Sequence, residues 1–381
     1  MANKPKIRFK GFDDAWEQRK LNELLEKYED PVDTPHNGYE RIGIRSHAKG
    51  TFHSFVEPGK ELDTAKMHRV ASDKFILNIT FAWEHAVAIT DENDAGKLVS
   101  HRFPQFSFDE KLKSHFFKYL MLDRKFKEHL ELSSPGGAGR NRVLKISDML
   151  KYEIKIPSIG EQTKIAKYLD ELDHLITLHQ RKCDQMKELK KYMLKKMFPQ
   201  NGAKVPEIRF DGFTDDWEQR KLSDVVDSVD TGKSKFDKEG SSGEYPILGS
   251  TSVIGYDDEY DYEGDFILSA RVGANAGSLY RHAGKVKISD NTVFIQASQN
   301  IEFLYQLLIR FDIKRLSFGT GQPLVKASEL KRLELMMPTD MEEQIRIGVY
   351  FKNLDHLITL HQSKCENLKN LKKYMLRNMF V

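Results

Sequence analysis

The sequence predicts a mixed α/β protein in which two α/β domains alternate with two long helices that pack as an antiparallel coiled coil. Two pairs of internal repeats and two long heptad-like segments predict this duplicated, pseudo-two-fold architecture. The chain has 381 residues, enough for two or three domains with their own cores, and 39% of them are hydrophobic. Such a composition excludes a largely disordered chain.

The first repeat opens each half of the chain. Residues Ile7–Leu21 read IRFKGFDDAWEQRKL, and Ile208–Leu222 read IRFDGFTDDWEQRKL, 201 positions later. The second repeat is longer. Residues Leu172–Gln180 return unchanged at 354–362, an offset of 182, and Lys190–Leu194 return unchanged at the same offset. Two repeated segments therefore frame each half.

The segments between the repeats, 22–146 and 223–327, show no similarity to each other. The two halves thus share the same repeated segments, here called the frame, and differ in the variable segment that lies between those repeats. Two copies are too few for a solenoid, which needs about three stacked repeats. We therefore interpret the chain as a duplicated module whose repeated parts do a common job and whose inserts do different ones.

The second repeat predicts the long helices. No glycine or proline occurs from Glu161 to Phe198, and about 36 residues at 1.5 Å each make a helix of ~54 Å. Such a helix usually buries its apolar stripe against another helix; the alternative is a helix folded back on its own domain. The predicted seam consists of Leu169, Leu172, Ile176, Cys183 and Met186 in the first copy, and Phe351, Leu354, Ile358, Cys365 and Leu368 in the second.

Domain boundaries follow from these repeats. We predict a first domain over 1–160, a first helix over 161–201, a second domain over 202–341 and a second helix over 342–381. Within the inserts, short β-branched or aromatic runs bounded by turn residues predict strands. These runs are 75–80, 86–90, 245–248, 265–268 and 292–295, and helix-like stretches follow at 111–130 and 302–311.

Enzyme motifs are missing. Thr231–Ser234 resembles the end of a phosphate-binding loop, but Asp227 stands where that motif needs glycine. A stand-alone enzyme is therefore disfavoured, and we expect no bound metal or cofactor. The sequence shows neither a secretory signal nor a membrane span, so we expect a cytoplasmic protein with Cys183 and Cys365 reduced.

The loops instead offer basic and amide side chains, whose donors fit base edges and phosphates. Any single one could be an ordinary solvated loop residue, but glycine-rich loops carry them at equivalent places in both halves. The candidates in the first half are Arg45, His47, Lys49, Asn78, Trp83, Arg140, Asn141, Arg142 and Lys145. Those in the second half are Lys233, Ser234, Lys235, Arg271, Asn275, Gln322 and Lys326.

Together these features resemble the specificity (S) subunits of type I restriction-modification systems, in which two target recognition domains of dissimilar sequence alternate with two repeated conserved regions. The resemblance covers the whole chain, although the loop at 133–140 is longer than its counterpart at 317–322. Its carriers are Trp16–Leu21, Trp217–Leu222, Pro157, Pro338, and the Glu-Gln helix starts at 161–162 and 343–344.

The resemblance implies a non-catalytic DNA-reading subunit that serves DNA methylation and defence against foreign DNA. Each variable domain would read one half of a bipartite, asymmetric site in double-stranded DNA. The helices would set the half-site spacing and dock two modification (methyltransferase) subunits, which restriction subunits join. S-adenosylmethionine, ATP and Mg²⁺ would belong to those partners. A ~54 Å helix pair is long enough to hold two readers one DNA turn, ~34–36 Å, apart.

The distribution of charge adds an expectation about which subunits bind the DNA phosphates. Within the net charge of +3, residues 22–155 carry 0, residues 223–336 carry −4, residues 161–201 and 342–381 carry +3 each, and the rest of the chain carries +1. Because non-specific affinity comes mainly from neutralised phosphates, we expect weak binding alone and tight binding in the assembly. The competing hypothesis is a duplicated protein-binding scaffold without DNA readout.

Overall fold

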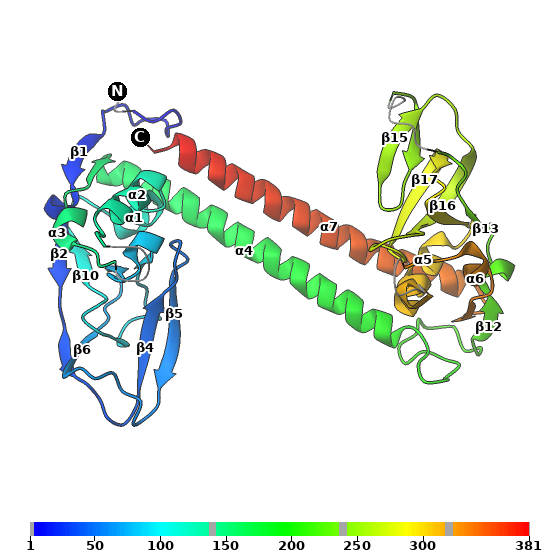
Figure 1. Cartoon of the computed structure of the whole chain (residues 1–381), viewed down its shortest axis with the longest axis horizontal. Helices are drawn as coiled ribbons and strands as arrows, with labels where there is room; N and C mark the ends of the chain where they lie inside the picture. The colour runs from blue at the N-terminus through cyan, green and yellow to red at the C-terminus, as the bar shows by residue number, and fades with distance from the viewer. Residues whose placement is uncertain (1–3, 137–141, 236–241, 317–322, 381) are drawn as a thin grey trace. The chain divides into compact units, whose positions relative to one another are not determined.

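The computed structural model of the chain describes residues 4–136, 142–235, 242–316 and 323–380. Contacts divide it into two compact units, one comprising Met1–Leu178 with Cys365–Val381 and the other His179–Lys364. We call these unit 1 and unit 2. Each contains one globular domain, named head 1 or head 2, together with part of each long helix (Figure 1).

Head 1 is built from two main sheets and a small ribbon. The order β2-β10-β7-β8 forms one sheet, β3-β6-β9-β4-β5 the other, and β1 pairs with β11. Its strands are β1 (Glu17–Lys20), β2 (Leu25–Tyr28), β3 (Pro31–Asp33), β4 (Tyr39–Ile44), β5 (Thr51–Val56), β6 (Lys66–Arg69), β7 (Phe75–Leu77), β8 (Val87–Ile89), β9 (Leu98–Val99), β10 (Gln105–Phe108) and β11 (Glu153–Ile156).

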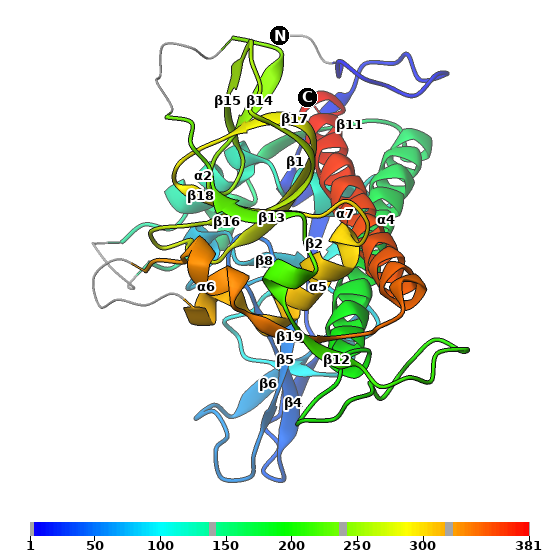
Figure 2. The same cartoon turned by 90° about the vertical axis from the view of Figure 1, so that its right-hand side faces the viewer.

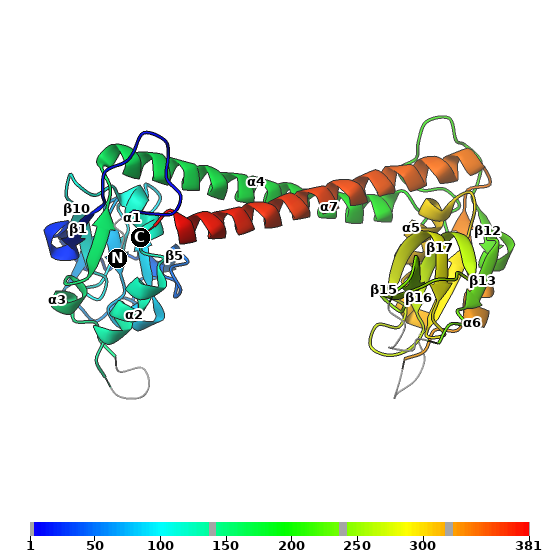
Figure 3. The same ribbon diagram turned by 90° about the horizontal axis from the view of Figure 1, so that it is seen from above.

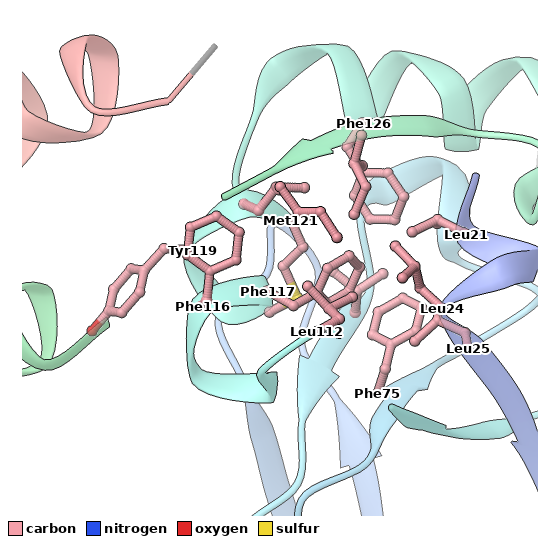
Figure 4. Close-up of a cluster of buried hydrophobic side chains, with 14 of the residues drawn as sticks. Leu21, Leu24, Leu25, Phe75, Leu112, Phe116, Phe117, Tyr119, Met121 and Phe126 are labelled. Carbon is pink, nitrogen blue, oxygen red and sulfur yellow. The ribbon is translucent and has the colours of Figure 1, made fainter. Parts of the chain in front are cut away.

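The core of head 1 lies where helices α1 (Ser114–Leu120), α2 (Arg124–Leu132) and α3 (Ile146–Met149) cover the first sheet. The fully buried Phe75 lies 5.1 Å from Phe117 and 6.3 Å from Phe126, centroid to centroid (Figure 4). The stretch 111–130 is thus two helices rather than one. Phe117 of α1 and Phe126 of α2 both turn into this core.

Head 2 contains one six-stranded sheet of order β13-β18-β16-β17-β14-β15, with α5 and α6 beside it, and a ribbon of β12 and β19 (Figure 2). Its elements are β12 (Glu218–Lys221), β13 (Ser228–Thr231), β14 (Tyr245–Leu248), β15 (Val253–Asp257), β16 (Tyr262–Ala270), β17 (Leu279–Ile288), β18 (Thr292–Gln296), α5 (Ile301–Phe311), α6 (Ala327–Lys331) and β19 (Glu334–Met337). Short 3-10 turns at 21–23, 82–84, 222–224 and 313–316 complete the two heads.

The long helices are α4 (Ile159–Lys196) and α7 (Met341–Asn378), each of 38 residues or ~57 Å. In unit 1, Lys372 near the end of α7 bonds Asp173 near the start of α4. In unit 2, Lys190 near the end of α4 bonds Asp355 near the start of α7. The helices therefore run antiparallel within each unit (Figure 3), which confirms the predicted fold class. Within the described residues, no helix is both long and apolar enough to cross a membrane.

The predicted seam residues are all buried or half-buried. Leu169 and Leu172 of α4 share a hydrophobic cluster with Leu368 of α7, and Phe351 and Leu354 of α7 share one with Met186 of α4. Both cysteines are free thiols. His179 and His361, the same position of the repeat, meet in unit 2 with their Nδ1 atoms 2.9 Å apart. Burial and the neighbouring His361, Lys364 and Lys182 lower the pKa of His179. Across the described residues, no three His, Cys, Asp or Glu side chains gather as a metal site would require.

The two copies of the first repeat, Ile7–Leu21 and Ile208–Leu222, which we call the lead-in segments, hold the long helices by their ends. Arg8 forms a two-pronged ion pair with Glu161 at the start of α4, and Arg209 forms the same pair with Glu343 at the start of α7, each with an Nε–Oε1 distance of 2.7 Å. Both glutamates are fully buried. The ion pair explains why the Glu of each Glu-Gln helix start is repeated together with the Arg of each lead-in segment.

The lead-in segments also meet the opposite helix ends. The Ile7 N–H donates to the carbonyl of Asn378 in unit 1, and the Ile208 N–H donates to the carbonyl of Lys196 in unit 2, both at 2.9 Å. Since Lys196 and Asn378 are the same position of the repeat, the two joints are equivalent. In each unit, a lead-in segment therefore contacts the start of one long helix and the end of the other.

Candidate nucleic-acid interface

In head 1, the candidate residues gather around the tip of the β4–β5 hairpin. His47 and Ala48 lie in the left-handed region with φ of 64° and 51°, which makes the turn. Their N–H groups donate to the carbonyls of Glu84 and His85, at 2.9 and 2.8 Å. The hairpin tip is therefore fixed to the loop after β7, and it exposes Arg45, His47 and Lys49.

Asn78 and Trp83 build that second loop. The Asn78 Oδ1 accepts hydrogen bonds from the Thr80 N–H and hydroxyl, and the Trp83 Nε1–H donates to the Thr80 carbonyl at 3.2 Å. The Arg142 guanidinium lies over the Trp83 ring, 5.5 Å from its centroid. The structure therefore brings Trp83 and Arg142 together, while the Asn78 oxygen is used inside the loop.

Buried His85 supports the same loop from below. Its Nε2 lies 2.8 Å from the Met121 carbonyl, to which it donates. Burial lowers the pKa of His85 more than this hydrogen bond raises it. A neutral imidazole is therefore favoured here, and His85 serves as a support, with 6% exposure.

The remaining candidates of head 1 are placed unevenly. Lys145 is exposed just before α3, and its N–H donates to the Ser133 carbonyl at 2.8 Å. Arg140 and Asn141 lie outside the described residues. Sequence reasoning missed the exposed Arg102, whose carbonyl accepts from the Ile79 N–H at 3.0 Å and so lies beside the second loop. No spacing or motif marks Arg102, since only the pairing of distant loops brings it here.

In head 2, the candidate loops converge on the turn at 289–291. The Ser234 N–H donates to the Ile288 carbonyl at 3.0 Å, and its carbonyl accepts from the Asp290 N–H at 3.1 Å. The Arg271 N–H donates to the Asn291 carbonyl at 3.1 Å, and its guanidinium to the Asp290 carbonyl at 3.2 Å. Segments 233–235 and 271–275, far apart in sequence, are thus neighbours.

A third segment joins this cluster. The Val325 N–H donates to the Arg271 carbonyl at 2.8 Å, which brings the exposed Lys326 close by. Gln322 lies outside the described residues. Lys233, Lys235 and Asn275 are exposed, whereas the Ser234 hydroxyl donates to Asp261 at 2.7 Å. Sequence reasoning passed over the exposed Asn291, although its Ser-Asp-Asn turn was visible in the sequence.

Close backbone packing explains the phosphate-loop-like Thr231–Ser234. A Cβ on Gly232 would lie 2.3 Å from the Ile288 carbonyl oxygen, so only glycine fits there. The glycine lets the loop pack on the strand end and forms no phosphate cradle. Two equivalent frames therefore carry two different clusters of exposed donors, here named loop cluster 1 and loop cluster 2, centred on residues 45–49 and 289–291.

Comparison with known proteins gives this arrangement a family. The sequence profile of the type I restriction modification DNA specificity domain matches residues 14–188 and 214–370. The specificity subunit of the MjaVIII type I restriction enzyme from Methanocaldococcus jannaschii is 28% identical over 269 residues. That of the EcoprrI enzyme from Escherichia coli is 26% identical over 115 residues.

These alignments are partial. They cover 61% of this chain and 61% of the MjaVIII subunit, and 30% of this chain and 28% of the EcoprrI subunit. A crystal structure of the S subunit of a type I restriction-modification system from M. genitalium has the same fold, with a TM-score of 0.66 and 16% identity over 99% of both chains. Both the profile match and the duplicated frame lead to one conclusion: the chain belongs to the family of type I restriction-modification DNA specificity domains, which it carries twice.

Proposed function

We propose that the chain is the non-catalytic subunit that gives a type I restriction-modification complex its DNA sequence specificity. The observation that carries the proposal is the pair of equivalent frames holding two unrelated loop clusters. Each head would read one half of a bipartite, asymmetric site in double-stranded DNA. Exposed arginine, lysine and asparagine side chains in the clusters supply donors for base edges and phosphates.

The catalytic chemistry belongs to partners in this proposal. Modification subunits supply methyl transfer with S-adenosylmethionine, and restriction subunits supply ATP- and Mg²⁺-dependent chemistry, in the cytoplasm. The head segments carry net charges of 0 and −4, so neither has a net positive charge to clamp phosphates. Partners therefore contribute much of the non-specific affinity, and any test of DNA recognition should use the assembled complex.

Exchanging residues 22–146 for the variable segment of another family member should change one half-site and leave the other as it was. Preference for the original half-site should fall about 10³-fold or more, the usual gap between specific and non-specific binding. The measurement is the mapping of methylated positions in genomic DNA from cells that carry the complete system.

The reciprocal exchange of residues 223–327 is the matched control, because it should change only the other half-site. A simultaneous change of both half-sites after a single exchange would contradict the modular assignment. Methylation without any bipartite motif in cells carrying the natural chain would contradict the proposed function itself.

The long helices carry the surface that we assign to the modification subunits. Four exposed apolar side chains in unit 1 have exposed counterparts 182 positions away in unit 2. The set in unit 1 is Leu175, Leu178, Leu371 and Tyr374, and the set in unit 2 is Leu357, Leu360, Leu189 and Tyr192. We call these sets patch 1 and patch 2. Their exposures match closely, at 36–55% and 37–52%.

Geometry places each patch on one side of its helix pair. In both patches the residue that follows a patch residue contacts the opposite long helix or belongs to the seam: Leu175 precedes Ile176 of the seam, Leu178 precedes His179, and Leu371 precedes Lys372. On two antiparallel helices facing each other, such positions lie on the same side of the pair. Exposed apolar surface of this kind marks a protein interface, and two equivalent patches fit two copies of one partner.

The double substitution Leu175→Glu with Leu371→Glu should remove one of two modification subunits from the complex. A charge buried without a partner costs several kcal/mol, so binding at patch 1 should weaken by about 100-fold or more. Native mass spectrometry of the complex with its cognate modification subunit should show one copy instead of two. Changing Leu189 and Leu357 to Glu should have the same effect at patch 2.

Thr177→Glu and Thr359→Glu are matched controls, because these exposed equivalents directly follow Ile176 and Ile358 of the seam and so lie on the other side of the seam from Leu175 and Leu357. Both controls should retain two copies. Two bound copies in either patch variant would contradict the assignment of the patches, while leaving the DNA-reading proposal intact.

A further inference from the structure

In each head, the variable segment contributes one short helix that contacts the long helices. We call α1 of head 1 and α5 of head 2 the docking helices. At the start of α1, the Lys113 N–H donates to the Gln162 side chain at 2.9 Å. At the start of α5, the Asn300 side chain donates to Gln344. Because Gln162 and Gln344 are the same position of the repeat, the two docking helices begin at equivalent points.

Three residues further on, each docking helix places a phenylalanine on a repeated tryptophan. The Phe116 ring lies 6.0 Å from Trp16, and the Phe303 ring lies 6.1 Å from Trp217, both edge-on. Both tryptophans are buried. The two docking helices are thus structurally equivalent, although their sequences are unrelated.

A third contact lies further along each docking helix, on the aspartate of the repeated Leu-Asp-His-Leu-Ile segment. In unit 1, the Tyr119 hydroxyl lies 2.6 Å from Asp170 Oδ1 and 2.9 Å from Asp173 Oδ2, so its single proton is available to both carboxylates. The Lys372 ammonium of α7 donates to Asp173 Oδ1 at 2.5 Å. Figure 4 shows Tyr119 at the edge of the hydrophobic cluster, with its hydroxyl turned away from it. Asp173 therefore joins α1, α4 and α7 at one point.

Unit 2 makes the same joint with a different residue. The Gln306 side-chain amide donates to Asp355 Oδ2 at 3.1 Å, and the Lys190 ammonium of α4 donates to Asp355 Oδ1 at 2.6 Å. Arg281 of β17 adds a longer ion pair at 3.8 Å. In both units, one carboxylate oxygen binds the opposite long helix and the other binds the head.

We infer that Asp173 and Asp355 are positioning residues that fix the angle of each docking helix on the helix pair, and so restrict the complex to one half-site spacing. The inference rests on the proposed function. The first two contacts lie within one turn of the docking helix. The third lies six residues from the first, ~9 Å along the axis, and its directional hydrogen bonds resist rotation of the docking helix about the first two. In head 1, the bonds from His115 and Lys118 to Asp170 act in the same way.

The surroundings of Tyr119 suit this role. Burial raises the pKa of its hydroxyl, and hydrogen bonds to Asp170 and Asp173 raise it further, so the proton stays available for donation. Asp170 also binds Lys118 and His115, at 2.9 and 2.8 Å. Burial works to raise the pKa of Asp170, but the bonds from Tyr119, His115 and Lys118 outweigh it and lower the pKa. Asp170, which accepts hydrogen bonds from the same docking helix, therefore stays ionised near neutral pH.

The test uses the chain assembled with its cognate modification subunits, and DNA carrying both half-sites at a series of spacings. The natural chain should methylate one spacing. Tyr119→Phe, and Asp173→Ala combined with Asp170→Ala so that Tyr119 loses both acceptors, should methylate spacings one base pair shorter or longer to within about 10-fold of the best one, with base preferences unchanged. Tyr119→Gln should restore the single spacing, because head 2 uses glutamine at this position.

Asp184→Ala is the matched control, since this exposed aspartate of α4 bonds Gln180 of its own helix; it should keep the single spacing. A single spacing in both Tyr119→Phe and the double variant would overturn the inference. Joint loss of base preference and assembly in those variants would also overturn it, by showing a purely structural role. Absence of any bipartite preference in the natural chain would instead reject the proposed function.

Discussion

Replacing Arg209 by alanine should destabilise unit 2 by about 3–5 kcal/mol, the usual cost of leaving a buried charge without its partner. Glu343, fully buried, receives both prongs of this arginine at 2.7 and 2.8 Å. Arg8→Ala should act in the same way on unit 1 through Glu161. Chemical denaturation followed by a probe in each unit measures both effects.

The pH dependence provides an independent check. A buried carboxyl without its arginine has a raised pKa, because burial disfavours the charged form. Its destabilising effect is present above the ordinary glutamate pKa of about 4.3 and grows as the pH rises. The Arg209→Ala penalty should therefore be smaller at pH 5 than at pH 8.

Lys127→Ala is the control for the ion pair, since Lys127 pairs with Glu131 at 3.7 Å on the surface and such pairs contribute about 0–1 kcal/mol. A penalty for Arg209→Ala no larger than that of the control would show that this ion pair does not hold the helix start in place.

The second large effect concerns the aromatic cluster in each unit. One phenylalanine of each cluster comes from the other half of the chain. Phe198, just beyond the end of α4, lies 5.8 Å from Trp217 and stacks on Phe303 at 5.9 Å. Phe380, just beyond the end of α7, lies 6.3 Å from Trp16 and stacks on Phe116 at 5.4 Å. A residue near the C-terminus thus completes the core of the N-terminal head.

Phe198→Ala should destabilise unit 2 by about 3–5 kcal/mol, and Phe380→Ala should destabilise unit 1 by about 2–3 kcal/mol, because Phe380 is only partly buried. Amide hydrogen exchange should locate the loss. In Phe380→Ala, protection should fall in head 1, some 200 or more residues away in sequence, and stay unchanged in head 2.

Leu132→Ala provides the comparison, because this side chain is 84% exposed and its removal should stay within about 0.5 kcal/mol. Equal loss of protection in both heads of Phe380→Ala, or none in head 1, would contradict the assignment of Phe380 to unit 1.

The repeats made the frame predictable from the sequence. A heptad-like stripe repeated at one offset, as in Leu172 and Leu354, allows only a few packings, and the antiparallel pairing followed from the equivalence of the copies. The reason for the repeated Glu-Gln could not be foreseen. Glu161 and Gln162 bind an arginine and a docking helix that lie far away in sequence.

The loop clusters were predictable only as a set of residue types. Asn78 was a sound candidate by chemistry, yet its oxygen binds Thr80 in its own loop, and Arg102 had no distinguishing neighbours. Which polar side chain faces outward depends on hydrogen bonds between distant segments. The equivalence of α1 and α5 could not be predicted from the sequence either. Tyr119 and Gln306 both contact the repeated aspartate, but a phenol and an amide show no sequence similarity.

The paired joints at Ile7–Asn378 and Ile208–Lys196 bear on how such a protein can be encoded. Residues 197–207 bridge one joint as a covalent loop, whereas hydrogen bonding and packing make the other. The two halves therefore contact each other through two equivalent joints, and the fold does not distinguish the covalent joint from the non-covalent one. A gene that read the second half before the first would specify the same neighbours. A gene for one half alone would specify one head and one long helix. That helix would lack its partner helix until a second copy of the half supplied one.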